Sequence, residues 1–172
     1  MSHLRATAVV IPLFLLLPAL LDAQGGLSPA DVKRFEGTWT LDVERSGVTS
    51  PERRTITVSP QWIRVETERP EDDRPPVLIY RLDGAENINP YGIATATSRL
   101  RREGENLITE TVFTIRDQPV TVTEVLHLSA SGADMTVETT LRVEHGYQGV
   151  QPPLEARAPN MSKATTVFHR QR

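Results

Sequence analysis

Glu124 has the strongest claim to a chemical role among the acidic residues of this 172-residue chain. It belongs to the run 120–128, in which every second residue is apolar except Glu124 itself. Alternate side chains of a β-strand share one face of the sheet, so Glu124 lies on the face of Val122 and Leu126. A carboxylate on such a face costs free energy unless it is hydrogen-bonded or protonated. Glu124 therefore predicts either a binding site or a buried polar network.

Hydroxyl side chains are expected around Glu124. Strand registers set by the turns place Ser98, Thr109 and Thr139 in one row with it. The row is either the polar anchor of a ligand cavity or a satisfied structural network near one end of a barrel, where strand tilt carries Glu124 to the rim. Glu124 as a catalytic base would also need a positioned partner and an electrophilic stabiliser, and the sequence identifies neither.

Other residue types capable of chemistry do not form recognisable sites. His127 shares the outer face with Glu110 and Glu138, but zinc catalysis requires three ligands that converge on a pocket, so these are predicted to be solvated charges. There is no Gly-x-Ser-x-Gly elbow and no glycine-rich phosphate loop. The sequence therefore predicts no catalytic residue, no metal and no cofactor.

The segments that position Glu124 indicate an all-β protein. Short runs rich in Thr, Val and Ile alternate with turn residues, as in a sandwich or barrel. The predicted strands are 37–43, 53–59, 62–68, 76–82, 93–102, 106–115, 119–129, 134–144 and 163–170. The segments 46–52, 70–75 and 83–92 are predicted as connections. A short helical turn precedes the strands, with Ser28 as N-cap, Pro29 at the first helical position and Asp31 completing a capping box.

Three turns align the four strands between 93 and 144. Turns at Glu103-Gly104, Arg116-Asp117 and 130–133 predict these opposed pairs: Leu100 with Leu107, Phe113 with Val120, and Leu128 with Met135. All three registers put apolar side chains on one inner face and charged ones on the other, and a slip of one residue would reverse both sets. The predicted ligand-binding residues on the inner face are Ser98, Thr109, Thr111, Phe113, Glu124, Leu126, Val137 and Thr139.

The chain is expected to be exported. Residues 1–23 read as a signal peptide, with Arg5 before an apolar stretch and a cleavage site before Gln24. Residues 24–172 then form one domain with no membrane span. The absence of cysteine favours a bacterial periplasmic or secreted protein, because small eukaryotic secreted domains usually carry disulfides. A net charge of −3 argues against a nucleic-acid partner, which needs a basic patch.

The first strand resembles the start of lipocalin-like barrels. A helical turn leads into Gly37-Thr38-Trp39-Thr40-Leu41-Asp42, and the last strand reads Val167-Phe168-His169-Arg170. These motifs are similar to those of short exported bacterial proteins described as lipocalin-like. The resemblance implies an antiparallel up-and-down barrel of about eight or nine strands. It also implies that Trp39 packs beneath Arg170 as a structural closure of one barrel end.

Three functions are compatible with such a barrel. The leading hypothesis is a non-catalytic carrier that binds a small apolar or amphipathic molecule in its lumen, since small lining residues leave volume unfilled. The second is an envelope or interaction module with a filled barrel, whose long segment 145–162 contacts a protein partner. The third is an enzyme that uses Glu124. An enclosed cavity of roughly 300 Å³ or more would favour the carrier.

Overall fold

The chain folds into an antiparallel β-barrel with two short helices. The computed structural model describes residues 26–72, 76–92, 94–144 and 159–171. Over these ranges the strands are β1 (Gly37–Leu41), β2 (Arg53–Val58), β3 (Trp62–Glu68), β4 (Val77–Arg81), β5 (Asn87–Tyr91), β6 (Ala94–Glu103), β7 (Asn106–Ile115), β8 (Gln118–Leu128), β9 (Asp134–Val143) and β10 (Asn160–Arg170). The helices are α1 (Pro29–Lys33) and α2 (Val43–Ser46).

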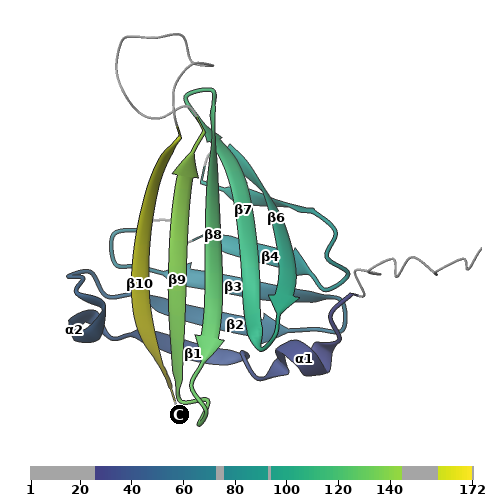
Figure 1. Cartoon of the computed structure of the whole chain (residues 1–172), viewed down its shortest axis with the longest axis vertical. Helices are drawn as coiled ribbons and strands as arrows, with labels where there is room; N and C mark the ends of the chain where they lie inside the picture. The colour runs from purple at the N-terminus through teal and green to yellow at the C-terminus, as the bar shows by residue number, and fades with distance from the viewer. Residues whose placement is uncertain (1–25, 73–75, 93, 145–158, 172) are drawn as a thin grey trace, which may run out of the picture.

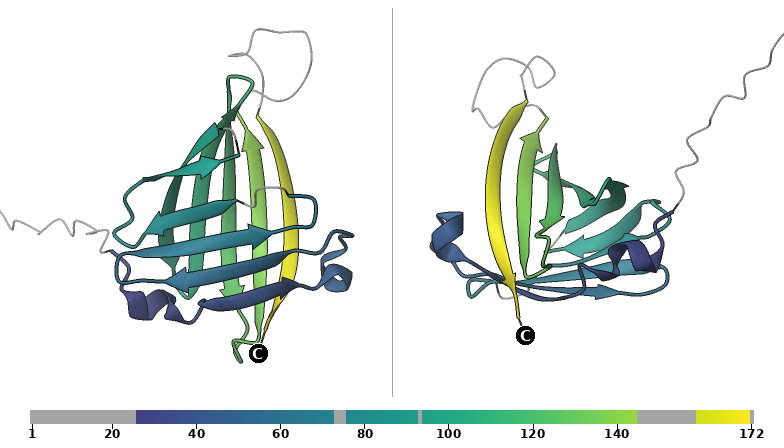
Figure 2. Two further views of the ribbon diagram at one scale, coloured as in Figure 1. Left: turned by 180° about the vertical axis from the view of Figure 1, so that it is seen from behind. Right: turned by 60° about the horizontal axis from the view of Figure 1, so that its bottom comes forward.

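The ten strands form one continuous sheet with the order β4-β3-β2-β1-β10-β9-β8-β7-β6-β5. The pairing of β1 with β10 joins the two ends of the domain and sets Trp39 opposite Arg170. Strands β1 to β4 run across the back of β6 to β10, so that the sheet curls around an interior (Figures 1 and 2). The fold class is therefore an all-β, up-and-down, nearly closed barrel.

Asparagine side chains bridge the two edge strands, β4 and β5. The backbone N–H of Ile79 donates to the Oδ1 of Asn89 (2.9 Å), and the Ile79 carbonyl accepts from the Nδ2 of Asn89 (3.0 Å) and of Asn87 (3.1 Å). Asn89 is almost fully buried. These side chains satisfy edge groups of β4 that a strand ladder would otherwise pair.

Two of the three predicted registers are confirmed and one is wrong. Phe113 lies opposite Val120, and Leu128 lies opposite Met135. Leu100, however, lies opposite Thr109, because the two-residue turn is Gly104-Glu105 and not Glu103-Gly104. Gly104 adopts a φ of 59°, a left-handed conformation that suits glycine. The error is two residues, so every side chain keeps its predicted face.

The strand count was underestimated because β5 carries weak strand signals. The segment 83–92 was predicted as a connection, but Asn87–Tyr91 pairs with β6. It contains two asparagines and Pro90, residues that are depleted in strands and tolerated at a sheet edge. The last strand begins at Asn160 rather than at residue 163, and pairs with β9 over its first residues too.

The interior contains two packed apolar clusters, and between them lies a layer of polar side chains around Glu124, the polar level. The larger cluster, at the α1 end, includes Trp39, Leu126 and Val137; the smaller includes Phe113 and Val120. Along β8 the inward residues run from Val120 through Glu124 to Leu126, which leaves Glu124 between the clusters. Glu110 and Glu138 are exposed on the outer face. The predicted sorting of the two faces is therefore confirmed.

The helix α1 closes one end of the barrel. Its predicted cap is confirmed: the Ser28 side chain accepts from the backbone N–H of Asp31, and the Asp31 carboxylate accepts from that of Ser28. Val32 and Phe35 are fully buried against the larger cluster. In the described part of the chain, neither helix has the length and apolar character to cross a membrane. The predicted signal peptide lies outside the described residues. Most of the segment 145–162 also lies outside them, and the last residues of that segment, from Asn160, belong to β10.

Candidate functional site

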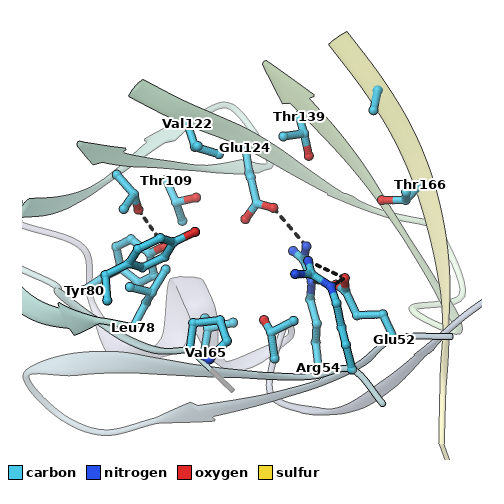
Figure 3. A pocket seen from close by; sticks show the side chains of 16 residues that line it. Glu52, Arg54, Val65, Leu78, Tyr80, Thr109, Val122, Glu124, Thr139 and Thr166 are labelled. Atoms are coloured by element: carbon cyan, nitrogen blue, oxygen red, sulfur yellow. Dashed lines mark hydrogen bonds and ion pairs between the residues drawn. The ribbon is translucent and has the colours of Figure 1, made fainter. Parts of the chain in front are cut away.

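A cavity of about 260 Å³ lies inside the barrel at the polar level between the two clusters (Figure 3). Strands from both halves of the sheet contribute to its wall. The lining residues are Glu52, Arg54, Val65, Thr67, Arg69, Pro76, Leu78, Tyr80, Tyr91, Thr109, Thr111, Val122, Glu124, Thr139, Ala164 and Thr166. One part of the wall is aliphatic and aromatic, and the other carries charges and hydroxyls. Such a mixed wall suits a small amphipathic molecule.

Arg54 is the central charged group of the site. Its Nε donates to the Oε1 of Glu52 (2.5 Å), and its Nη2 lies 3.0 Å from the Oε1 of Glu124. The guanidinium carbon lies 4.9 Å from the ring centre of Phe168 on β10, a cation–π contact. Only 8% of Arg54 is exposed. A guanidinium removed from water in this way requires carboxylate partners, and it has two.

Burial and pairing act on Arg54 in opposite directions. Burial alone lowers the pKa of Arg54, but the carboxylates of Glu124 and Glu52 outweigh it and raise that pKa. The guanidinium therefore stays charged. The same competition operates on Glu52: burial raises its pKa, and Arg54 and Arg69 together bring the pKa of Glu52 below its usual range.

Glu52 connects Arg54 to the outer part of the cavity. It immediately precedes β2, and its Oε2 accepts from the Nε of Arg69 at 2.7 Å. The side chain of Arg69 is 39% exposed, whereas that of Glu52 is 9% exposed. The four side chains thus form a charge chain, Arg69–Glu52–Arg54–Glu124, from the solvent side of the cavity to its interior wall.

Hydroxyl groups line the cavity beside Glu124. The Tyr80 hydroxyl is hydrogen-bonded to Thr111 (Oη to Oγ1, 3.2 Å), and Thr111 contacts the Oγ of Ser98 at 3.4 Å. Burial, and then the charge of Glu124, raise the pKa of Tyr80 to about 12. The phenol is therefore protonated at neutral pH and remains available as a hydrogen-bond donor.

Four of the eight predicted ligand-binding residues line the cavity: Thr109, Thr111, Glu124 and Thr139. The pairing of Thr109 with Glu124 and of Glu124 with Thr139 is as the registers predict. Ser98 does not share this row, because it lies opposite Thr111. It is fully buried and reaches the cavity wall only through Thr111.

The other three residues lie away from this cavity. Leu126 and Val137 fill the larger cluster. Phe113 stacks on Tyr91, with ring centres 4.6 Å apart, in the smaller one. All three are at least nine-tenths buried, so they shape the barrel and do not face the cavity.

The sequence interpretation missed the charged half of the site. Glu124 forms an ion pair with Arg54, which the sequence analysis did not consider beside the neighbouring hydroxyls, and it lines the interior cavity. A signal for Arg54 was present: it alternates with Ile56 and Val58, so it shares their inward face. What the pattern could not show is which strand faces it across the interior.

Trp39 and Arg170 lie at the end of the barrel that α1 covers. The guanidinium carbon of Arg170 is 4.2 Å from the ring centre of Trp39, and the Trp39 Nε1 donates to the Phe35 carbonyl (3.0 Å). Arg170 also donates to the carbonyls of Arg34 (2.6 Å), Gly132 (3.0 Å) and Glu36. Neither Trp39 nor Arg170 lines the cavity. Their contacts are with each other and with the protein backbone at this end of the barrel.

On the outer face, the Nε2 of His127 is 3.7 Å from the Oε1 of Glu138, too far for a hydrogen bond. Glu110 lies on the neighbouring strand opposite Thr123. In the ranges that the structure describes, no group of three or more His, Cys, Asp or Glu side chains is arranged to hold a metal ion.

Solved structures share this architecture at low sequence identity. A secretory abundant heat soluble protein from Ramazzottius varieornatus superposes with a TM-score of 0.53 at 10% identity, over 80% of this chain and 96% of that one. Lipid binding protein 8 from Caenorhabditis elegans, without ligand, gives 0.52 at 10% identity, over 81% and 96%. A second heat soluble protein of R. varieornatus gives 0.51 at 14% identity, over 81% and 96%. No protein-family model and no curated protein sequence matches the chain. The chain therefore has the fold of lipocalin-like, calycin-type β-barrels.

Proposed function

We propose that this protein is a non-catalytic, exported barrel that binds one small amphipathic molecule in its interior cavity. The observation that carries the proposal is the cavity itself, which lies between two packed clusters and is lined on one side by Val65, Leu78 and Val122 and on the other by Arg54 and Glu124. Protein interiors are close-packed and contain few voids larger than a water molecule, so a space of this size supports a binding role. The proposed export rests on the signal-like residues 1–23.

The cavity volume limits the size of the ligand. At about 260 Å³ it lies just below the usual lower limit for ligand pockets, about 300 Å³. We therefore propose a small ligand, of about ten non-hydrogen atoms. Lipid binding protein 8 is by its name a lipid-binding protein. For the cavity of this protein we propose a medium-chain molecule of about eight carbons.

A binding experiment with a cavity-filling variant tests this proposal. Native mass spectrometry of the protein from its own host, and titration calorimetry with octan-1-ol, octanamide, octanoate and octylammonium, would detect a ligand. Val122→Trp fills the cavity from β8 and should abolish binding. Val125→Trp places the same indole on the opposite face of β8 and should leave it intact. If no bound mass appears and none of the four compounds binds, the proposal is wrong.

A further inference from the structure

The charged residues of the cavity form a neutral, internally paired set. Two guanidiniums, of Arg54 and Arg69, face two carboxylates, of Glu52 and Glu124. Both oxygens of Glu52 are engaged, Oε1 by Arg54 and Oε2 by Arg69. The Oε1 of Glu124 lies 3.0 Å from Arg54. The pairing therefore leaves no uncompensated positive charge to attract an anionic ligand.

Among the described residues, no hydrogen bond to the Oε2 of Glu124 is formed. The ion pair of Glu124 with Arg54 is made through its other oxygen, Oε1, at 3.0 Å from Nη2. The Glu124 side chain projects from β8 into the space between Tyr80 and Arg54 (Figure 3). It keeps 19% of its surface exposed although it points into the barrel, so this exposure is toward the cavity. A carboxylate oxygen in this position is a ready acceptor for a ligand N–H or O–H.

We infer, on the basis of the proposed function, that the ligand is uncharged and carries a hydroxyl or primary amide group that donates to Glu124. A ligand carboxylate would meet the carboxylate of Glu124 in an enclosed site and would add a net charge without a counter-ion, which is unfavourable. An ammonium ligand would have the same difficulty beside Arg54. A neutral donor satisfies the free oxygen of Glu124 and leaves the charge balance unchanged.

The surrounding hydroxyls complete recognition of the same group. Thr109 and Thr139 flank Glu124 on the two neighbouring strands, and both line the cavity. A hydroxyl can donate as well as accept, so either could donate to the oxygen of an alcohol or amide that is bound to Glu124. The aliphatic side chains of Val65, Leu78 and Val122 then contact the ligand's hydrocarbon part.

Ligands of matched length test this inference in the wild-type protein. Octanamide and octanoate have the same number of non-hydrogen atoms and differ in charge, and octylammonium supplies the opposite charge. Titration calorimetry at pH 7 should show that octanamide binds at least about tenfold more tightly than octanoate or octylammonium, as expected for a charge-assisted hydrogen bond. If octanoate binds as tightly as octanamide, this inference is wrong while the proposed function stands. If none of the compounds binds, this inference is wrong, and the proposed function falls with it when native mass spectrometry also shows no bound mass.

A variant identifies Glu124 as the discriminating residue. Glu124→Gln removes a negative charge beside Arg54 and should weaken the preference for octanamide over octanoate by at least about tenfold. Glu110→Gln makes the same change on the outer face of β7 and should leave the preference unchanged. An unchanged preference in a folded Glu124→Gln variant would contradict the assignment. Should that variant fail to fold, the wild-type comparison still decides.

Discussion

The Arg54 guanidinium on β2 meets the Glu124 carboxylate on β8 across the barrel interior, with Nη2 and Oε1 3.0 Å apart. These strands are not neighbours, because β1, β10 and β9 stand between them in the sheet. The pair therefore connects the two halves of the barrel through its interior rather than along its wall. Together with Glu52 it places a charged group at the level where the apolar clusters leave space.

Replacing Arg54 by Met should be strongly destabilising. The change leaves Glu124 without its cation and Glu52 with only Arg69, and stranding a buried carboxylate costs about 3–5 kcal/mol of unfolding free energy. Urea denaturation at pH 7 measures the effect. The loss should shrink as the pH falls below about 4.5. Burial raises the pKa of Glu52, but Arg54 and Arg69 bring it below its usual value, so the stabilisation by Arg54 is lost as Glu52 becomes protonated.

Arg53→Met is the matched control for this prediction. Arg53 is the neighbouring residue on β2 and pairs with Glu68 on the outside of the barrel, where both side chains are exposed. An exposed ion pair contributes about 0–1 kcal/mol. Equal losses for Arg53→Met and Arg54→Met would show that the interior pair has no special energetic role.

Most of the fold could be predicted from the sequence, because local patterns determine the long strands. Strands β6 to β9 are long, alternate cleanly and are joined by short turns, so local sequence determines their faces and, for two of three hairpins, their register. β5 escaped prediction because its stability comes from pairing with β6 and from the Asn89 bridge, and its own residues are poor strand formers.

The site was only half predictable for a related reason. Thr109, Glu124 and Thr139 lie on adjacent strands, so hairpin registers bring them together. Arg54 meets Glu124 only because the sheet closes, and no local rule connects β2 to β8. Curvature of the whole barrel decides that contact. The alternation of Arg54 with Ile56 and Val58 indicates that its side chain points into the barrel. The identity of its partner follows only from the three-dimensional structure.

Replacing Asn89 by Ala should loosen the β4–β5 edge. The variant removes the acceptor of the Ile79 N–H and one of two donors to the Ile79 carbonyl. Leaving a fully buried backbone donor unpaired costs about 1–3 kcal/mol, and the partly buried Ile79 N–H should cost toward the lower end of that range. Hydrogen exchange at the Ile79 amide should accelerate more than exchange at amides of β8. Ile88→Ala, at a neighbouring side chain that is 74% exposed, should change neither stability nor exchange appreciably.

Replacing Arg170 by Met should destabilise the end of the barrel that α1 covers. The guanidinium stacks over Trp39 and donates to carbonyls of Arg34, Glu36 and Gly132, so one residue ties β10 to the β8–β9 turn and to the segment before β1. Loss of the cation–π contact and these hydrogen bonds should lower the unfolding free energy by about 2–4 kcal/mol. Ligand affinity should stay within about threefold of wild type, since Arg170 does not line the cavity.

Arg142→Met controls for the loss of a positive charge near the end of a strand. Arg142 on β9 pairs with Glu144, which follows the end of the strand, and the two side chains are 47% and 44% exposed. Chemical denaturation should place this variant within about 1 kcal/mol of wild type. A comparable loss in both variants would mean that the Trp39–Arg170 stack contributes nothing beyond an ordinary surface charge.

His169 should make the stability of the barrel depend on pH. Its Nδ1 lies 2.7 Å from the Oδ1 of Asp134, and its Nε2 lies 2.7 Å from the Oδ2 of Asp42. These two aspartates raise the pKa of His169. The pKa of Asp134 is lowered, chiefly by His169; that of Asp42 is lowered by the backbone N–H of Arg45 and then by His169. The bridge joins β10, β9 and the residue before α2.

The signs of these shifts define the pH range of the effect. A raised histidine pKa stabilises the fold below the unfolded value, about 6.5, and this contribution is lost as pH rises through the folded value. The lowered aspartate pKa values stabilise the fold above about 3.9, and that contribution is lost as pH falls. The melting temperature of His169→Gln should therefore fall furthest below wild type between about pH 4 and 6.5. At pH 9 His169→Gln and wild type should melt together. His127→Gln should change the melting temperature little at any pH, because the Nε2 of His127 lies 3.7 Å from the Oε1 of Glu138, too far for a hydrogen bond. A difference between His169→Gln and wild type that grows toward pH 9 would contradict the charged bridge.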